Sequence, residues 1–292
     1  MVESKKFLDF ARRGAGLAGH PEMSYVPISD PSGPFVILPT YNECENLPAL
    51  VAAILALPVS MHVVVVDDHS PDGTGRLADE LVARDPAVHV VHRGSKLGLG
   101  TAYGAGFRLA LALGADPILT MDADFSHDPR YLPALLEASR RFDLVIGSRY
   151  VPGGSTLHWG PERKALSWGA NTTAHLILGL NARDCTAGFR CYRRSVLESV
   201  DLEAIRADGY SYLIEMLFHC QRLGFSVGEV PIVFADRRRG RSKISRSEIF
   251  KAGLTVLRLV GLRLAGAGRH GRNTVTPERD FPRGAAPREE SE

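Results

Sequence analysis

Cysteine is scarce in this chain of 292 residues, which has four cysteines and no CxxC pair. The sequence therefore excludes a disulfide-stapled secreted domain and a cysteine-based zinc site. We expect Cys44, Cys185, Cys191 and Cys220 to be reduced thiols of a cytoplasmic protein.

Long apolar runs are also lacking. No stretch of about 18 uncharged apolar residues occurs, so we expect no helix that spans a bilayer. Lys5 and Lys6 are not followed by an apolar segment, which argues against a secretory signal.

Excess charge of one sign is missing too, since 35 Lys and Arg oppose 33 Asp and Glu, a net charge of +2. This near balance gives no reason to expect a nucleic-acid partner. A hydrophobic content of 45% and a charged content of 23% are ordinary for a globular chain, and the length allows one large domain or two small ones. The GxxxxGK[ST] phosphate loop is absent.

The body of the chain alternates short apolar runs with helical patterns. Strands are predicted at 35–38, 62–66, 88–92, 117–121 and 145–148, and helices at 47–55, 75–84 and 100–113. Such alternation is typical of βαβ units. The predicted fold class is therefore α/β, a mostly parallel sheet flanked by helices.

Polar and acidic segments follow three of the predicted strands. They are Pro39–Glu43, Asp67-Asp68 and Asp122-Ala123-Asp124. Ligands of parallel α/β sheets bind beyond the carboxyl ends of the strands, so these segments predict one site at one sheet edge.

The Asp122-Ala123-Asp124 segment is a DxD motif directly behind a strand. Two carboxylates one residue apart can both approach one divalent cation. Their hard oxygen atoms suit Mg²⁺ or Mn²⁺, which share ligands with substrate phosphates. The alternative is a pair of solvated loop acids.

The segments around Asp68 and Gly98 leave two interpretations open. Asp67-Asp68 and the turn-forming residues after it fit a turn before a helix, and Asp68 could also accept hydrogen bonds from a nucleobase or ribose. The glycine-rich stretch 98–104 lacks GxGxxG spacing and fits a glycine turn with close helix packing.

Basic residues gather in the second half of the chain. Arg149 follows a predicted strand, and Arg163 and Lys164 are expected in the loop that comes next. Five basic residues stand within Asp236–Lys243, where an anion would relieve their mutual repulsion. We expect a phosphate clamp here, with a solvated basic loop as the alternative.

The chain divides into four predicted segments. Residues 1–33 are expected to be a mobile arm, 34–250 the catalytic domain, 251–268 an amphipathic helix and 269–292 a disordered tail. The helix has an apolar face (Leu254, Leu257, Val260, Gly261 and Leu264) and three basic residues (Lys251, Arg258 and Arg263). It could lie in a membrane interface with its basic residues on headgroups, or pack on the domain.

Nine ordered motifs between residues 35 and 250 resemble those of the family 2 glycosyltransferases, and within them the dolichol- or polyprenol-phosphate mannosyltransferases. The motifs are LPTYNE (38–43), VVDDHSPDGT (65–74), KLGLGTAYGAGF (96–107), MDADFSHDP (121–129), GSRY (147–150), RKALSWGAN (163–171), DCTAGFRCYRR (184–194), GEVPIVFADR (228–237) and GRSK (240–243). The resemblance implies a GT-A fold with a Rossmann-like nucleotide-sugar-binding half. It also implies a GDP-mannose donor, Mg²⁺ or Mn²⁺ as cofactor, and a polyprenyl or dolichyl phosphate acceptor.

The resemblance also implies roles for individual residues. The guanosine end of the donor would be held by Pro39, Tyr41, Glu43, Val66 and Asp68. The sugar diphosphate and metal would be held by Asp122, Ala123 and Asp124, with Asp122 and Asp124 as metal ligands. The phosphate groups would be bound by Arg149, Arg163, Ser167, Arg237 and Lys243, and the residues implied as catalytic are Asp124, Arg149 and Lys243.

Two departures from the family bear on these expectations. Some relatives have Gln where this chain has Ser126, so the third protein ligand of the metal is absent or replaced by water. Other relatives carry membrane helices after the catalytic domain. We therefore expect a peripheral protein on the cytoplasmic face of a membrane, which reaches its lipid through helix 251–268, a membrane-anchoring partner protein, or both.

Three alternatives remain beside mannose transfer. The sugar could be glucose or another hexose on a lipid phosphate. A sugar-nucleotide nucleotidyltransferase would place a glycine-rich loop with a basic residue after the first strand, where this chain has Pro39–Glu43. A non-catalytic binding subunit would have no need of Asp122, Asp124, Arg149 and Lys243.

Overall fold

The computed structural model describes residues 33–236 and 246–266. The strands are β1 (Phe35–Thr40), β2 (His62–Asp67), β3 (Val88–His92), β4 (Ile118–Thr120), β5 (Leu144–Ser148), β6 (Ser155–Leu157), β7 (Arg190–Tyr192), β8 (Val227–Pro231) and β9 (Val233–Ala235). The α-helices are α2 (Leu47–Leu55), α3 (Thr74–Arg84), α4 (Leu99–Ala112), α5 (Leu132–Ala138), α6 (Pro161–Leu178), α7 (Arg194–Ser199), α8 (Tyr210–Arg222) and α9 (Arg246–Gly266). The predicted strands and helices up to β5 are confirmed, with shifts of one or two residues at their ends.

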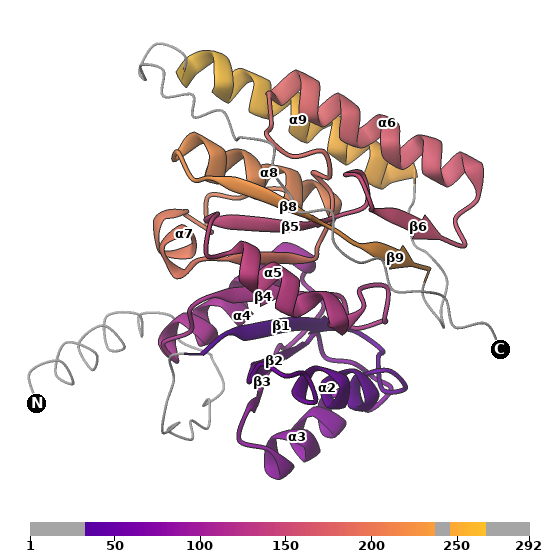
Figure 1. Ribbon diagram of the computed structural model, residues 1–292, viewed down its shortest axis with the longest axis vertical. Helices are drawn as coiled ribbons and strands as arrows, with labels where there is room; N and C mark the ends of the chain where they lie inside the picture. Colours follow the sequence, from indigo (N-terminus) through magenta and orange to yellow (C-terminus); the bar gives the residue numbers. More distant parts are fainter. Residues whose placement is uncertain (1–32, 237–245, 267–292) are drawn as a thin grey trace, which may run out of the picture.

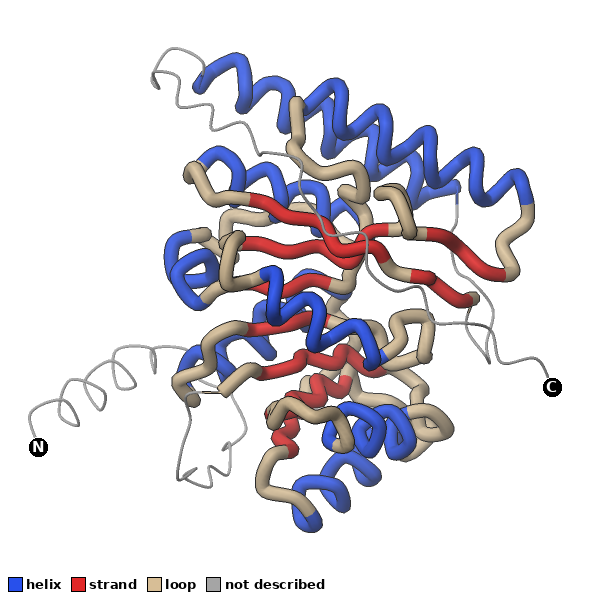
Figure 2. Tube along the Cα trace, viewed as in Figure 1, coloured by secondary structure: helices blue, strands red, loops and turns tan. Residues whose placement is uncertain are grey.

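A seven-stranded sheet forms the centre of the fold, in the order β3-β2-β1-β4-β7-β5-β8 (red strands in Figure 2). Only β7 within this sheet runs antiparallel to its neighbours, so the predicted mostly parallel sheet is confirmed. A short parallel pair, β6 and β9, forms a second sheet that adjoins the first, because a single residue separates the end of β8 from the start of β9. Because β2 and β4 flank β1, the chain reverses its winding direction at β1, where ligands of such sheets bind.

Helices cover both faces of the sheet because successive strand side chains point to opposite sides. Phe35 and Ile37 pack with residues of α4 and α8 in one core, whereas Val36 and Leu38 pack with residues of α2, α3 and α5 in the other. Strands buried on both sides require the continuous apolar runs seen in the sequence.

Helix α6 corrects one expectation. Arg163 and Lys164 do not lie in a loop but in the first turn of α6, which begins with Pro161 after Gly160. Proline suits this position because its fixed φ matches the helix and the first N–H groups have no helical partner. The helix ends at Gly179, whose φ of 63° allows the left-handed cap.

Helix α9 lies beside α6 and α8, on the side of the molecule drawn at the top of Figure 1. It runs without a break from Arg246 to Gly266, so the expected boundary between residues 250 and 251 falls inside a helix. Leu259 is fully buried and Val256 nearly so in the core shared with α8. The expected arm (1–33) lies outside the described residues except for residue 33, and the expected tail (269–292) lies wholly outside them.

Candidate active site

The loops after β1, β2 and β4 contain residues in a left-handed backbone conformation. Asn42, His69 and Phe125 have φ values of 62°, 59° and 60°. Such values are uncommon for residues other than glycine, above all for a bulky residue such as Phe125. Backbone strain of this kind collects at functional sites, where the surrounding contacts maintain it.

The loops after β1 and β2 are joined by hydrogen bonds. The N–H groups of Asn42, Glu43 and Cys44 donate to Ser70, Thr74 and Asp72, over 3.0, 2.9 and 3.1 Å. Although its burial acts in the opposite direction, hydrogen bonds from Thr74 and Cys44 lower the pKa of Asp72 to about 2. These hydrogen bonds therefore join the two loops into one unit at the sheet edge, which contains Tyr41 and Glu43.

The residues expected to hold the nucleoside come together on this edge. Pro39 and Val66 are register partners of β1 and β2, and Asp68 follows β2. Val66 is fully buried, as Ala123 nearly is, so these two can contribute only backbone atoms. The segments predicted to hold the nucleoside therefore lie side by side, but the sequence did not distinguish exposed side chains from buried ones.

Asp68 has a partner that sequence reasoning missed. Its carboxylate is paired with Arg93, which follows β3, and both side chains are less than one tenth exposed. Burial raises the pKa of Asp68, and Arg93 opposes that rise. Nearby, the Lys96 ammonium lies 3.8 Å from the centre of the Tyr41 ring. The position of Arg93 and Lys96 at the end of a predicted strand was the available signal.

The DxD carboxylates have different surroundings. Asp124 is 5% exposed, and its Oδ1 accepts a hydrogen bond of 3.0 Å from the N–H of Ser126. The Asp122 side chain is 39% exposed, and the backbone N–H of Asp122 donates to Nδ1 of His127 over 3.0 Å. His127 is buried against Phe189 and must accept through Nδ1, so its neutral form carries the proton on Nε2. Burial lowers the pKa of His127 despite the nearby acids.

These carboxylates fit a divalent cation that shares the ligands of a substrate. Among the described residues there is no group of three or more His, Cys, Asp and Glu side chains able to hold a metal. A Mg²⁺ ion usually takes one or two carboxylates and completes its shell with water and phosphate oxygens. Asp122 and Asp124 supply such hard ligands, so the donor set fits a metal that arrives with a diphosphate.

Arg149 is held in place by a buried carboxylate. Its Nε and Nη2 donate to the two oxygens of Asp184 over 2.7 and 2.6 Å, and Nη2 also donates to Thr186 over 2.8 Å. Burial opposes ionisation of Asp184, but the Arg149 guanidinium keeps the pKa of Asp184 below its ordinary value. Sequence reasoning did not identify this pair, because the two residues are 35 positions apart.

Arg163 and Ser167 lie on α6 near this pair. The Arg163 guanidinium is 4.0 Å from the centre of the Trp159 ring, and it donates to Asp236 over 2.9 Å. Nε of Arg163 and Nε1 of Trp159 are buried without hydrogen-bond acceptors among the described residues. Ser167 accepts a hydrogen bond of 2.7 Å from the Tyr150 hydroxyl.

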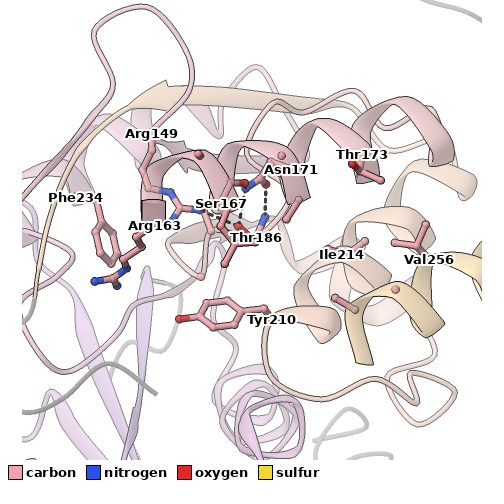
Figure 3. A pocket seen from close by; sticks show the side chains of 18 of the residues that line it. Arg149, Arg163, Ser167, Asn171, Thr173, Thr186, Tyr210, Ile214, Phe234 and Val256 are labelled. Atoms are coloured by element: carbon pink, nitrogen blue, oxygen red, sulfur yellow. Dashed lines mark hydrogen bonds between the residues drawn. The ribbon is translucent and has the colours of Figure 1, made fainter. Parts of the chain in front are cut away.

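A cavity of about 850 Å³ connects these polar residues to α6 and α9. Asp122, His127, Arg149 and Arg163 line one part, and apolar side chains such as Ile214 and Val256 line the rest. Figure 3 shows Arg149, Arg163 and Phe234 at one end and Ile214 and Val256 at the other, with α6 along the cavity. The cavity can therefore take a ligand with a charged head and a long apolar part.

The outer faces of α6 and α9 are apolar and exposed. Leu257 and Leu264 of α9 are 69% and 72% exposed, and Trp168 and Leu176 of α6 are 61% and 69% exposed. Two basic residues of α9 were expected to contact lipid headgroups, but their side chains have partners within the fold. Arg258 is paired with Glu215 on α8, and Arg263 donates to the Ile177 carbonyl over 2.9 Å.

Two of the expected phosphate ligands, Arg237 and Lys243, lie outside the described residues. Within the described part, no helix has the length and apolar character that crossing a bilayer demands.

The mostly parallel sheet flanked by helices, with acidic segments after β2 and β4, is a fold of the GT-A type. The sequence comparison is more specific. A profile of glycosyl transferase family 2 matches residues 35–201, and the chain belongs to this family. It is a glycosyltransferase.

Two relatives are similar over most of their length. An undecaprenyl-phosphate mannosyltransferase of Micrococcus luteus is 49% identical over 222 residues, which cover 76% of this chain and 91% of the relative. A polyprenol monophosphomannose synthase of Mycolicibacterium smegmatis is 51% identical over 219 residues, which cover 74% and 83%. Among solved structures, glucosyl-3-phosphoglycerate synthase of Mycobacterium tuberculosis with Mn²⁺ and UDP has a TM-score of 0.57 at 21% identity, with 78% of each chain covered. This last similarity concerns the fold.

Proposed function

We propose that the protein transfers mannose from GDP-mannose to a polyprenyl phosphate and gives polyprenyl phosphate mannose. The observation that carries the proposal is the cavity, because it joins a DxD carboxylate, two arginines and an apolar channel in one space. The names of the two relatives that are about half identical support the sugar and the acceptor. GDP as the nucleotide follows from the family resemblance.

The reaction needs no catalytic base in this arrangement. The acceptor phosphate is already ionised at neutral pH, so its oxygen attacks C1 of the sugar directly, the bond between C1 and the diphosphate breaks, and GDP leaves. We expect inversion at C1 in a single displacement. Arg163 and Ser167 orient the acceptor phosphate. Arg149 is fixed by Asp184, so its guanidinium cannot turn to pair with the attacking oxygen and weaken it as a nucleophile.

Asp122 and Asp124 hold a Mg²⁺ or Mn²⁺ ion in this proposal. When bound, the cation offsets the negative charge that develops on the leaving diphosphate. Arg237 and Lys243, in the segment between β9 and α9, supply further positive charge. The solved relative with Mn²⁺ and UDP supports a metal on this fold.

The outer faces of α6 and α9 form the membrane-binding surface in this proposal. Leu264, Trp168 and Leu176 enter the headgroup region, and Leu257 is both exposed and part of the cavity lining, to which the same two helices contribute. The prenyl chain then passes from the bilayer into the cavity. This arrangement gives a peripheral protein on the cytoplasmic face, with or without an anchoring partner protein.

The test incubates the purified protein with Mg²⁺, labelled GDP-mannose and a short polyprenyl phosphate, followed by extraction into organic solvent. We expect label in the organic phase, lost with EDTA and with Asp122→Ala, and kept with the control Glu137→Gln, which changes an exposed carboxylate on α5. Label from UDP-glucose instead would establish the glucosyl alternative. Mannose 1-phosphate and a nucleoside triphosphate as the preferred substrates would establish a nucleotidyltransferase. No turnover with any donor, in the presence or absence of membranes, would favour a non-catalytic binding subunit over the proposed reaction.

A further inference from the structure

Tyr103 has a buried hydroxyl group with no visible purpose in the fold. The residue lies on α4 and is 1% exposed, and its ring stacks with those of Phe107 and Tyr212 at centroid distances of 6.0 and 5.9 Å. Its hydroxyl has no hydrogen-bond partner among the described residues. Buried hydroxyl groups are nearly always paired, and the Tyr103 hydroxyl differs from the unpaired hydroxyl of Tyr212 in lying beside the DxD motif.

The Tyr103 hydroxyl faces the DxD motif across a glycine. A Cβ atom placed on Gly188 would lie 3.2 Å from the hydroxyl oxygen, 3.5 Å from Oδ1 of Asp122 and 3.8 Å from Cε1 of His127. These three groups therefore border the same space, which the missing side chain of Gly188 leaves open. Gly188, Asp122 and His127 also line the cavity.

We propose that Tyr103 is a positioning residue whose hydroxyl donates a hydrogen bond to the Asp122 carboxylate when this carboxylate binds the metal and diphosphate of the donor. The inference rests on the proposed function, because it requires a metal-bound donor. A carboxylate that ligates a metal through one oxygen is oriented by a hydrogen bond to the other. The Asp122 side chain is 39% exposed at the cavity and so has room to turn.

Tyr212 provides a matched control for this role. Its hydroxyl is also buried and without a partner among the described residues, and its ring belongs to the same stack. The ring of Tyr212 packs beside Gly100, at the first turn of α4. The changes Tyr103→Phe and Tyr212→Phe therefore remove the same atom from similar surroundings, and only the first removes it from beside Asp122.

The experiment measures Mn²⁺ affinity of the full chain by electron paramagnetic resonance, with GDP present and no acceptor. We expect Tyr103→Phe to weaken Mn²⁺ binding about 10- to 100-fold, the range found for groups that support metal ligands. Tyr212→Phe leaves the affinity within about twofold of the unchanged protein. Both variants keep the thermal unfolding midpoint, since neither loses a hydrogen bond within the fold.

A double-mutant cycle completes the test. Tyr103→Phe should have no further effect on Mn²⁺ affinity when Asp122→Asn is already present. Unchanged affinity in Tyr103→Phe, equal losses in both tyrosine variants, or additive losses with Asp122→Asn would each overturn the inference while the proposed function stands. If the unchanged protein binds no Mn²⁺ with GDP or UDP, the metal site of the proposed function fails and the inference fails with it.

Discussion

Arg258 of α9 donates a hydrogen bond to the carboxylate of Glu215 on α8, whose side chain is 1% exposed. The same carboxylate accepts a hydrogen bond of 2.9 Å from the N–H of Ala207. Helix α9 is thus attached to the catalytic domain by a charged pair as well as by Leu259. Deletion of residues from 251 onward would therefore remove part of the core, and point changes are the better probes of this helix.

The first prediction concerns this attachment. Arg258→Ala should lower the free energy of unfolding by about 1.5–3 kcal/mol, the range for a hydrogen bond to a charged group, because Glu215 then stays buried with its charge less well paired. Urea unfolding followed by circular dichroism measures the change. The control Arg84→Ala breaks an exposed pair with Glu80 and should cost less than about 1 kcal/mol. Equal effects of the two changes would contradict the structural role of Arg258.

The second prediction concerns the buried pair of Arg149 and Asp184. Asp184→Ala should lower the free energy of unfolding by about 3–5 kcal/mol, because it leaves a guanidinium buried without its carboxylate. Asp79→Ala is the control, since it removes an exposed carboxylate that pairs with His92. A loss of transfer in Asp184→Ala with undiminished stability would mean instead that Asp184 acts on the substrate.

The sequence allowed most of the sheet to be predicted, because β1 and β2 are continuous apolar runs between turn-forming residues. It did not reveal α6, since Trp159-Gly160-Pro161 looks like a loop and polar residues fill the first turns of the helix. The proximity of Pro39–Glu43, Asp67-Asp68 and Asp122-Ala123-Asp124 was predictable, because the carboxyl ends of parallel strands lie at one edge of the sheet. The partners of their side chains, such as Arg93 for Asp68 and Asp184 for Arg149, depend on tertiary packing that spacing along the chain does not encode.

The third prediction concerns His127, which sequence reasoning left without a role. His127→Ala should reduce kcat about tenfold or more. The backbone N–H of Asp122 then loses its acceptor, and this hydrogen bond no longer holds the DxD loop in place. His127→Asn offers an amide oxygen near the position of Nδ1 and should recover part of the activity. Steady-state kinetics with both variants make the comparison. If Asn is no better than Ala, the acceptor at this position is not what matters.

The fourth prediction is a pH dependence of stability that arises near the amino ends of β1, β2 and β3. Burial, together with the neighbouring His62, lowers the pKa of His89 to about 4 from an ordinary value of 6.5. The unfolded chain therefore binds a proton at higher pH than the folded one, so this contribution to stability is complete above pH 6.5 and is lost as the pH falls toward 4.

Unfolding measured between pH 7 and pH 4 tests the His89 prediction. In His89→Phe the stability should fall less steeply over this window, because the aromatic stack with Phe35 and His62 remains but no proton binds at this position. A slope unaltered by His89→Phe would contradict the assignment.

The fifth prediction separates membrane binding from chemistry. Replacing Trp168 and Leu264 by serine should weaken binding to vesicles several-fold, because each change removes exposed apolar surface from α6 or α9 that does not line the cavity, at about 25 cal/mol for each Å² that would enter the lipid. Vesicle co-sedimentation measures binding, and transfer to a short, water-soluble polyprenyl phosphate measures chemistry. Leu223→Ser is the control, since Leu223 is 53% exposed directly after α8 and belongs to neither helix. We expect the double variant to lose transfer in vesicles and to keep it with the soluble acceptor. Equal losses with both acceptors would mean that the two side chains line the path of the substrate rather than bind the membrane.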